Sequence, residues 1–287
     1  MTMKKILLFL FVFLSINTTP SYAAIRYSKL DVLPYADSSG VPKLAFRVKL
    51  LHDAKTYWRN AGEAGSPPYF NWQKSENVSD FKLYFPAPKR FEFMGIDSFG
   101  YTDEVIFPAD VKIKDINENA ILRIDIELLV CTDNCFPEYH KVNIPLKEYI
   151  NHYLEIRDEL QKLPVILKQE QLKASFISQE DEVVFLNLKF KAEDVKDVDY
   201  SFDLFVENDA GTMLDTPTIT TNEAGEVLVK AKIRYVENID QAKEELEGKP
   251  ITYTLSNGNR AYELASVFGD NKEIKKSPFM NFKFWRK

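Results

Sequence analysis

The chain has 287 residues, of which 45% are hydrophobic and 28% charged, and this is the composition of a globular protein rather than of a disordered or fibrous one. A formal net charge of −6 argues against nucleic-acid binding, and two Cys with three His are too few for a multi-disulfide scaffold or a four-Cys zinc site. The aromatic content of 13% favours β structure, because aromatic side chains suit pleated, half-buried surfaces.

Residues Met1–Ala23 are predicted to be a secretory signal peptide rather than part of the folded protein. Two lysines precede an apolar run at Ile6–Ile16, and small residues at Ser21 and Ala23 suit cleavage before Ala24. The run is too short to span a bilayer, although an uncleaved amino-terminal anchor is the alternative. No other stretch approaches transmembrane length. The sequence therefore predicts an exported mature chain without a membrane span, in a compartment where disulfides form.

Short runs that alternate apolar and polar residues follow the leader. Such runs, separated by turn residues, are typical of the strands of an antiparallel sandwich. The predicted strands of this part are Lys43–Leu51, Phe81–Phe85, Val105–Ile113, Ala120–Cys131 and Tyr139–Ile144.

Leu146–Leu163 is predicted to be a helix, because its apolar residues recur close to the 3.6-residue period. Pro145 stands at its start and Pro164 follows its end, and prolines commonly bound a helix in this way. The β pattern resumes beyond it. We therefore place a domain boundary here, with a first domain at residues 24–163 and a second at residues 164–287.

The second domain is also predicted to be a β-sandwich. Asn257-Gly258 is a hairpin signal, because both residues tolerate the positive φ of a primed turn. Glu237–Glu247 is a candidate short helix, and Lys272–Lys287 is a basic, aromatic tail that is either an edge strand or a loose end. The predicted strands are Val183–Phe190, Ser201–Val206, Val227–Tyr235 and Ile251–Leu255.

Cys131 and Cys135 are the main candidates for chemistry. Four residues of extended chain span about 13–14 Å, beyond the roughly 7 Å Cα limit of a disulfide, so the chain must turn between the two Cys if they pair. The residues between them, Thr-Asp-Asn, are of types that favour turns. A turn here would place Cys131 at the end of one strand and Cys135 at the start of the next, at the rim of the sheet. A loop this short gains only about 2 kcal/mol from its disulfide. A small, rim-exposed disulfide is the labile type, but a purely structural bond is also common in exported proteins.

Several motifs in order resemble one family. They are Lys55–Pro68 (KTYWRNAGEAGSPP) with Trp72 and Ser75-Glu76-Asn77, then Phe85–Arg90 (FPAPKR), Gly95, Gly100-Tyr101, and the two-Cys element with Pro137 after it. The pattern is similar to the amino-terminal periplasmic domain of the ScsB branch of the DsbD family of thiol-disulfide interchange proteins. The resemblance extends from about Lys43 to Leu146.

The resemblance implies an immunoglobulin-like sandwich whose Cys pair cycles between dithiol and disulfide. The fold expected is thus mostly β, with two immunoglobulin-like antiparallel β-sandwich domains joined by a short helix. Carried over, Cys131 and Cys135 are the redox pair, and the partner is a periplasmic protein with a thioredoxin fold. The sequence shows neither transmembrane helices nor a Cys-x-x-Cys thioredoxin-like domain. A separate membrane-embedded reductase is therefore expected to supply electrons, unless the protein is an oxidant sink, a thiol-linked chaperone or a metal handler.

The family's protective cap loop corresponds best to residues 91–95 (FEFMG), with Phe93 over the sulfurs. The alternative is that Phe91 and Phe93 are alternating core residues of a strand. Tyr57 and Trp58 are expected to be walls of the pocket, and at least one of them to be an ordinary core residue. The complete predicted cap and pocket set is Tyr57, Trp58, Phe93, Met94, Phe136 and Pro137.

Two other functions remain open from the sequence. Cys131, Cys135 and His140 form a C-x3-C-x4-H set that could bind Cu(I) or Zn(II), although the spacing is not a recognised zinc pattern. The chain could also be a non-catalytic interaction module with a structural disulfide. No cofactor is expected. Neither Cys stands at a helix amino terminus or beside a Lys that would lower its pKa, so the sequence does not identify the nucleophile.

Overall fold

The computed structural model describes residues 25–36, 38, 42–146 and 150–269. The predicted signal peptide and the basic tail at Lys272–Lys287 lie outside the described residues. No helix in the described part of the chain has the length and apolar character needed to cross a membrane.

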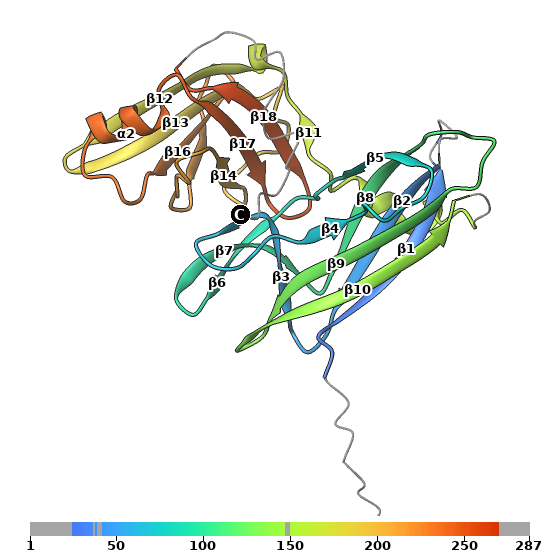
Figure 1. Ribbon diagram of the computed structural model, residues 1–287. Coiled ribbons are helices and arrows are strands. Elements are labelled where there is room, and N and C mark those ends of the chain that lie inside the picture. Colours follow the sequence, from blue (N-terminus) through green and yellow to red (C-terminus); the bar gives the residue numbers. More distant parts are fainter. Residues whose placement is uncertain (1–24, 37, 39–41, 147–149, 270–287) are drawn as a thin grey trace, which may run out of the picture.

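The amino-terminal half is a sandwich of two antiparallel sheets (Figure 1). One sheet has the order β1-β2-β8-β5, and the other has the order β10-β9-β3-β7-β6, with β4 also paired to β9. The strands are β1 Ser28–Ala36, β2 Pro42–Leu50, β3 Lys55–Gly62, β4 Tyr69–Asn71, β5 Val78–Leu83, β6 Lys89–Phe93, β7 Ile96–Thr102, β8 Glu104–Ile113, β9 Ile121–Cys131 and β10 Cys135–Pro145.

Alternation along the strands decides which face of each sheet is buried. In β9 the even-numbered side chains from Leu122 to Val130 are almost completely buried, while the odd-numbered ones up to Leu129 are only partly so. The even-numbered side chains pack between the two sheets against aromatic residues of the first sheet, such as Phe46 and Phe107. The odd-numbered side chains, which include Cys131, therefore lie on the outer face of the second sheet.

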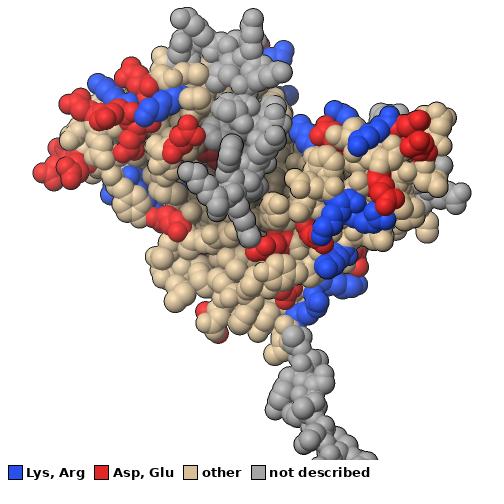
Figure 2. Space-filling view, viewed as in Figure 1, with Lys and Arg blue, Asp and Glu red and all other residues tan. Residues whose placement is uncertain are grey.

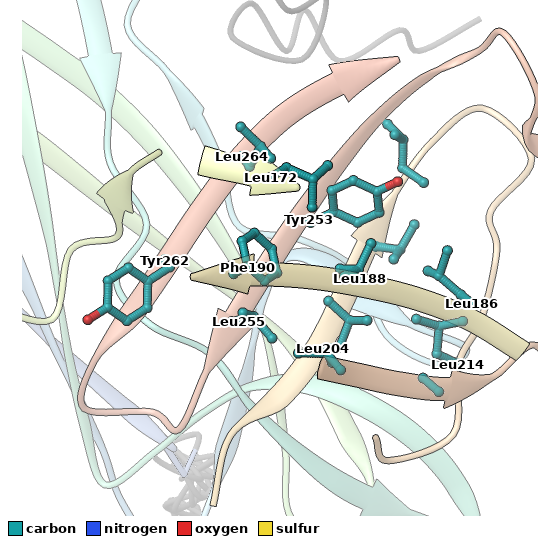
Figure 3. Packing of buried hydrophobic residues seen from close by; sticks show 14 of the residues in the cluster. Leu172, Leu186, Leu188, Phe190, Leu204, Leu214, Tyr253, Leu255, Tyr262 and Leu264 are labelled. Atoms are coloured by element: carbon teal, nitrogen blue, oxygen red, sulfur yellow. The ribbon is translucent and has the colours of Figure 1, made fainter. Parts of the chain in front are cut away.

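The carboxyl-terminal half is a second two-sheet sandwich, with orders β11-β18-β17-β14 and β12-β13-β16-β15. Leucine and aromatic side chains from both sheets, such as Leu188 and Tyr253, fill the space between them (Figure 3). The predicted hairpin at Asn257-Gly258 joins β17 to β18. The elements are β11 Val165–Ile166, β12 Leu172–Glu180, β13 Val183–Lys191, β14 Asp203–Glu207, β15 Thr218–Thr221, β16 Glu226–Lys232, α2 Ile239–Leu246, β17 Pro250–Ser256 and β18 Ala261–Val267. The predicted mostly β fold with two antiparallel β-sandwich halves is confirmed.

The helix between the halves is shorter than predicted. Helix α1 covers only Tyr153–Leu160, and Ile156 is its one buried residue. The residues just before it bond to the end of β1 instead of forming helical turns: the Ala36 amide donates to Asn151 Oδ1 at 3.1 Å, and the His152 amide donates to the Pro34 carbonyl at 3.0 Å. The prediction of a helix over Leu146–Leu163 was therefore wrong in extent, because tertiary hydrogen bonds outweigh the apolar periodicity here.

The two halves share part of one core. Phe205 of β14 is 1% exposed and packs edge-on against Phe99 of the amino-terminal half, with ring centroids 4.8 Å apart, and against Trp58 at 5.7 Å. In Figure 1 the carboxyl-terminal half lies against the part of the first sandwich that carries β3, β6 and β7. Apolar side chains from both halves are therefore buried together in this contact.

Candidate functional site

The two cysteines form a disulfide across a tight hairpin. Cys131 ends β9, Cys135 begins β10, and the two residues are direct partners in the antiparallel register with Cα atoms 4.0 Å apart. The turn between them is closed by the Thr132 amide, which donates to the Asn134 carbonyl at 3.0 Å. The predicted turn between the cysteines is therefore confirmed, although β10 begins at Cys135 and not at Tyr139.

The disulfide is less exposed than a rim position suggests. Cys131 is completely buried, whereas Cys135 is partly exposed. Both lie on the outer face of the second sheet in a small apolar cluster, apart from the main core. The other members of this cluster, which we call the disulfide cluster, are Tyr57, Ala61, Phe91, Phe93 and Leu129. The expectation of a rim-exposed bond is thus wrong for Cys131.

Tyr57 contacts both sulfurs. Its hydroxyl lies 3.0 Å from Cys131 Sγ and 3.7 Å from Cys135 Sγ, and its side chain is completely buried. Burial raises the pKa of the Tyr57 phenol, so the group stays protonated at neutral pH and can donate a hydrogen bond to sulfur. Gly65 leaves room for the ring: its φ is +107°, and a Cβ there would lie 2.1 Å from Tyr57 Cε1.

Trp58 lies on the other side of the same strand. Consecutive side chains of a strand point to opposite faces, so Trp58 enters the core between the sheets, where it is fully buried. Of the two predicted pocket walls, only Tyr57 reaches the disulfide.

Phe91 and Phe93 belong to a β-hairpin and also pack on the disulfide cluster. They alternate along β6, which pairs with β7, and the Phe91 ring lies 5.9 Å from that of Tyr57. The hairpin turns at Met94 and Gly95, both at positive φ (53° and 78°). Phe91 and Phe93 therefore alternate along a strand, and they also pack against the residues around the sulfurs. Their role as a cap stays a prediction. Met94, at the tip, is 80% exposed and is not part of the disulfide cluster.

Phe136 and Pro137 follow Cys135 on β10. Phe136 is 40% exposed and stacks on Tyr27, with ring centroids 5.1 Å apart and an interplanar angle of 5°. Pro137 is exposed and pairs in register with Leu129, a member of the disulfide cluster. By strand alternation Pro137 shares the face of Cys135, whereas Phe136 points to the opposite face.

His140 is placed away from the sulfurs. It is five positions beyond Cys135 and therefore on the other face of β10, where its Nε2 lies 2.9 Å from Ser28 Oγ. Burial lowers the pKa of the His140 imidazole against the opposing effect of Glu138, whose carboxylate accepts from the Tyr27 and Ser28 amides. This cluster ties β1 to β10. Among the described residues no group of three His, Cys, Asp or Glu side chains is arranged to hold a metal ion, so the geometry gives no support to the copper interpretation.

Lys55 is a site residue that sequence inspection missed. It is far from Cys131 in the chain, but the two are register partners across β3 and β9. Its Nζ lies 5.1 Å from the centroid of the Phe91 ring and donates to the Glu92 carbonyl at 3.5 Å. Side chains directly opposite one another on paired strands are neighbours, and a nearby cation lowers the pKa of a thiol. Lys55 is therefore a cation that the sheet register places beside the disulfide cluster.

Replacing Phe93 with alanine should speed reduction of the disulfide without unfolding the sandwich. Phe93 is only partly buried and lies outside both main cores, so its loss uncovers the sulfurs at a modest cost in stability. The measurements are the rate at which dithiothreitol reduces the disulfide, the alkylation rate of the reduced pair, and the denaturation midpoint. A core Phe truncated to Ala would instead cost about 3–5 kcal/mol. A large midpoint drop without a selective gain in reactivity would show that Phe93 has no shielding role.

Comparison with known proteins agrees with this geometry. Residues 31–146 match the family described as thiol:disulfide interchange protein DsbD, N-terminal, and residues 186–271 match a domain of unknown function, DUF8393. The structure resembles the crystal structure of the N-terminal periplasmic domain of ScsB from Proteus mirabilis, with a TM-score of 0.63 and 22% identity, over 85% of this chain and 94% of that one. A search of curated proteins gave no match. The segment at residues 31–146, which carries the Cys131–Cys135 disulfide, therefore matches the amino-terminal domain family of thiol:disulfide interchange protein DsbD.

Proposed function

We propose that this chain is an exported protein that exchanges electrons through Cys131 and Cys135 with a thioredoxin-fold partner in the periplasm. The observation that carries the proposal is a disulfide between directly paired residues, with a buried hydroxyl in contact with both sulfurs and a hairpin packed over them. A disulfide that served only to stabilise the fold would need neither the Tyr57 hydroxyl nor the packed β6–β7 hairpin beside it. The backbone pairing of β9 with β10 already holds the two strands together.

Exposure favours Cys135 as the sulfur that meets the partner. A partner thiolate attacks Cys135 Sγ and forms an intermolecular disulfide, the Cys131–Cys135 bond breaks, and Cys131 leaves as a thiolate. A second partner thiolate then attacks the partner's own bonded sulfur and releases Cys135 as a thiolate. Two electrons have then passed from the partner dithiol to this chain, and the same steps in reverse reduce a partner disulfide.

The buried sulfur has the surroundings of a stabilised leaving group. The Tyr57 hydroxyl, 3.0 Å from Cys131 Sγ, can donate to the thiolate, and Lys55 supplies positive charge from the neighbouring strand. A lower pKa of the leaving thiol speeds departure, so both groups favour attack at Cys135 over attack at Cys131.

The surface beside the disulfide suits a protein partner. In Figure 2 few Lys, Arg, Asp or Glu side chains lie over the β6–β7 hairpin and the β9–β10 turn. Large apolar and aromatic side chains are exposed here: Met94 (80%), Ile96 (42%) and Tyr139 (60%). Aromatic residues and Met are enriched in protein interfaces. A thioredoxin-fold protein is the partner that the family suggests, with a separate membrane-embedded reductase as the electron source.

The direct test is equilibration of the purified protein with glutathione buffers, followed by quantification of free thiols. We expect two thiols to titrate together at a potential above about −300 mV, the value below which disulfides resist glutathione. The variant with both cysteines replaced by serine is the blank. A bond that stays oxidised throughout would be structural, and the protein would then be an interaction module.

A further inference from the structure

The two halves of the molecule meet on the three strands that cover the disulfide. Strand β3 carries Tyr57, and the β6–β7 hairpin carries Phe91 and Phe93. The same strands supply the polar contacts that tie the halves together, through Arg59, Arg90 and Asp97.

The first contact between the halves is made by a bulge of β3 that begins directly after Tyr57. Strand β3 pairs with β7 at Tyr57–Gly100 and next at Gly62–Ser98, so four residues of β3 lie opposite a single residue of β7. The residues of this bulge reach into the carboxyl-terminal half: Trp58 packs on Phe205, and Asn60 Nδ2 donates to the Val206 carbonyl at 3.0 Å. Bulges re-aim neighbouring side chains, so the position of Tyr57 depends on how this segment is held.

Arg59 is the charged anchor of the bulge. It binds Glu207 through Nε at 3.0 Å and Nη2 at 2.6 Å, and Glu263 through Nη2 at 2.5 Å. Both carboxylates belong to the carboxyl-terminal half, and Glu207 is buried. Planar, two-pronged pairing of this kind fixes orientation as well as distance.

The second contact holds β6 beside Phe91. Arg90 binds Asp203 of β14 through Nε at 2.7 Å and Nη2 at 3.0 Å, and it donates to the Leu214 carbonyl at 2.9 Å. The same Nη1 that donates to the Leu214 carbonyl also binds Asp97 of β7 at 2.8 Å. One guanidinium thus joins both strands of the hairpin to the carboxyl-terminal half.

The third contact holds β7 close to the hairpin tip. Asp97 is the register partner of Glu92, one pair from Phe93–Ile96, and it binds Arg234 of the carboxyl-terminal half. Arg234 also binds Glu63 at 3.0 Å and is oriented by Asp215 at 2.5 Å. Burial alone would raise the pKa of Asp97, but its bonds to Arg90 and Arg234 hold it below the ordinary value.

We propose that the carboxyl-terminal half is a positioning element of the redox site, which holds Tyr57 and the β6–β7 hairpin over the disulfide through Arg59, Arg90 and Arg234. The inference rests on the proposed redox function of the cysteine pair. It assigns a role to the region that matches the domain of unknown function. Phe91 and Phe93 of the hairpin pack in the disulfide cluster, so lifting of the hairpin increases the access of a thiol to the partly exposed Cys135. Local opening of this kind is governed by the contacts that anchor the segment.

Replacing Arg234 with methionine should therefore raise the rate at which dithiothreitol reduces the disulfide of the full-length protein. Methionine keeps the aliphatic bulk but removes the bond between Asp97 and the carboxyl-terminal half, while Arg90–Asp97 remains. Partly buried ion pairs contribute enough for their loss to raise hairpin opening about fivefold. Backbone hydrogen exchange in residues 89–99 should increase by a similar factor, and exchange in β1 and β2 should not.

Arg260→Met is the matched control, because Arg260 pairs with Asp197 inside the carboxyl-terminal half. Among the described residues no ion pair joins Arg260 to β3 or to the β6–β7 hairpin. Arg234→Lys keeps the positive charge but loses the planar guanidinium that binds two carboxylates at once. Its reduction rate should therefore lie between those of wild type and Arg234→Met. If Arg234→Met does not fold, Asp215→Asn tests the same contact more mildly and should change the rate in the same direction.

Equal reduction rates for wild type and all Arg234 and Asp215 variants would overturn the positioning role. A wild-type bond that resists glutathione would instead overturn the redox function itself.

Discussion

Replacing Cys135 with serine is expected to leave a thiol that hardly reacts with oxidised glutathione, whereas replacing Cys131 should leave a reactive one. The difference follows from exposure: Cys131 is completely buried beneath Tyr57, and Cys135 is partly exposed at the start of β10. Reaction of a buried thiol requires local opening, so the two single variants should differ by on the order of a hundredfold in rate. Mass spectrometry of the glutathione adduct measures both rates directly.

The same pair of variants tests the reaction sequence. Cys131→Ser lacks the resolving thiol, so it should accumulate a mixed disulfide with an oxidised thioredoxin-fold protein, visible as a reducible band on a non-reducing gel. The Cys135→Ser variant should give little of this mixed disulfide. Circular dichroism of both variants supplies the control for folding. Faster adduct formation in Cys135→Ser than in Cys131→Ser would reverse the assignment of the partner-facing sulfur.

Replacing Phe205 with alanine is expected to destabilise the whole protein by about 3–5 kcal/mol. Phe205 is 1% exposed and packs on Phe99 and Trp58 of the other half, so truncation leaves a cavity where the two halves share their core. The Arg90 guanidinium, 6.0 Å from the centroid of the Phe205 ring, also loses part of its support. Denaturant unfolding followed by tryptophan fluorescence gives the free energy of unfolding.

Phe176→Ala is the matched control for this experiment, because Phe176 lies in the same half but is 44% exposed. Surface substitutions usually change stability by less than about 0.5 kcal/mol. If Phe205→Ala costs no more than Phe176→Ala, then Phe205 does not couple the halves. Loss of the Phe205 contact should also split a single unfolding transition into two, since each half has its own buried core.

The fold could be predicted where each strand has one buried face. Strands β9 and β13 were found because apolar residues alternate cleanly along Ile121–Cys131 and Val183–Lys191. Strands β3 and β7 were missed for a physical reason. Tyr57 and Trp58 are both buried, one in the disulfide cluster and one in the main core, and a bulge then breaks the period. In β7 four consecutive residues are buried, which removes the alternation altogether.

The candidate site was predictable to the extent that it is local. The turn between Cys131 and Cys135 follows from chain length and turn chemistry, and family resemblance located the hairpin that carries Phe93. The contacts of Tyr57 and Lys55 with the disulfide region depend on the register between β3 and β9, which are distant in sequence. That register cannot be predicted from the spacing of residues along the chain. The same is true of Arg234, whose partner Asp97 lies in the other half.

The shared interface has a consequence for how the protein is made. A chain synthesised from its amino terminus completes the β9–β10 hairpin, with both cysteines, well before Asp203, Glu207 and Arg234 exist to anchor the strands above it. The sulfurs are thus open to oxidants and to folding catalysts during biogenesis and become shielded last. We therefore expect first oxidation of the nascent pair to be faster than exchange in the finished molecule, because the residues that anchor the strands over the sulfurs are synthesised after both cysteines.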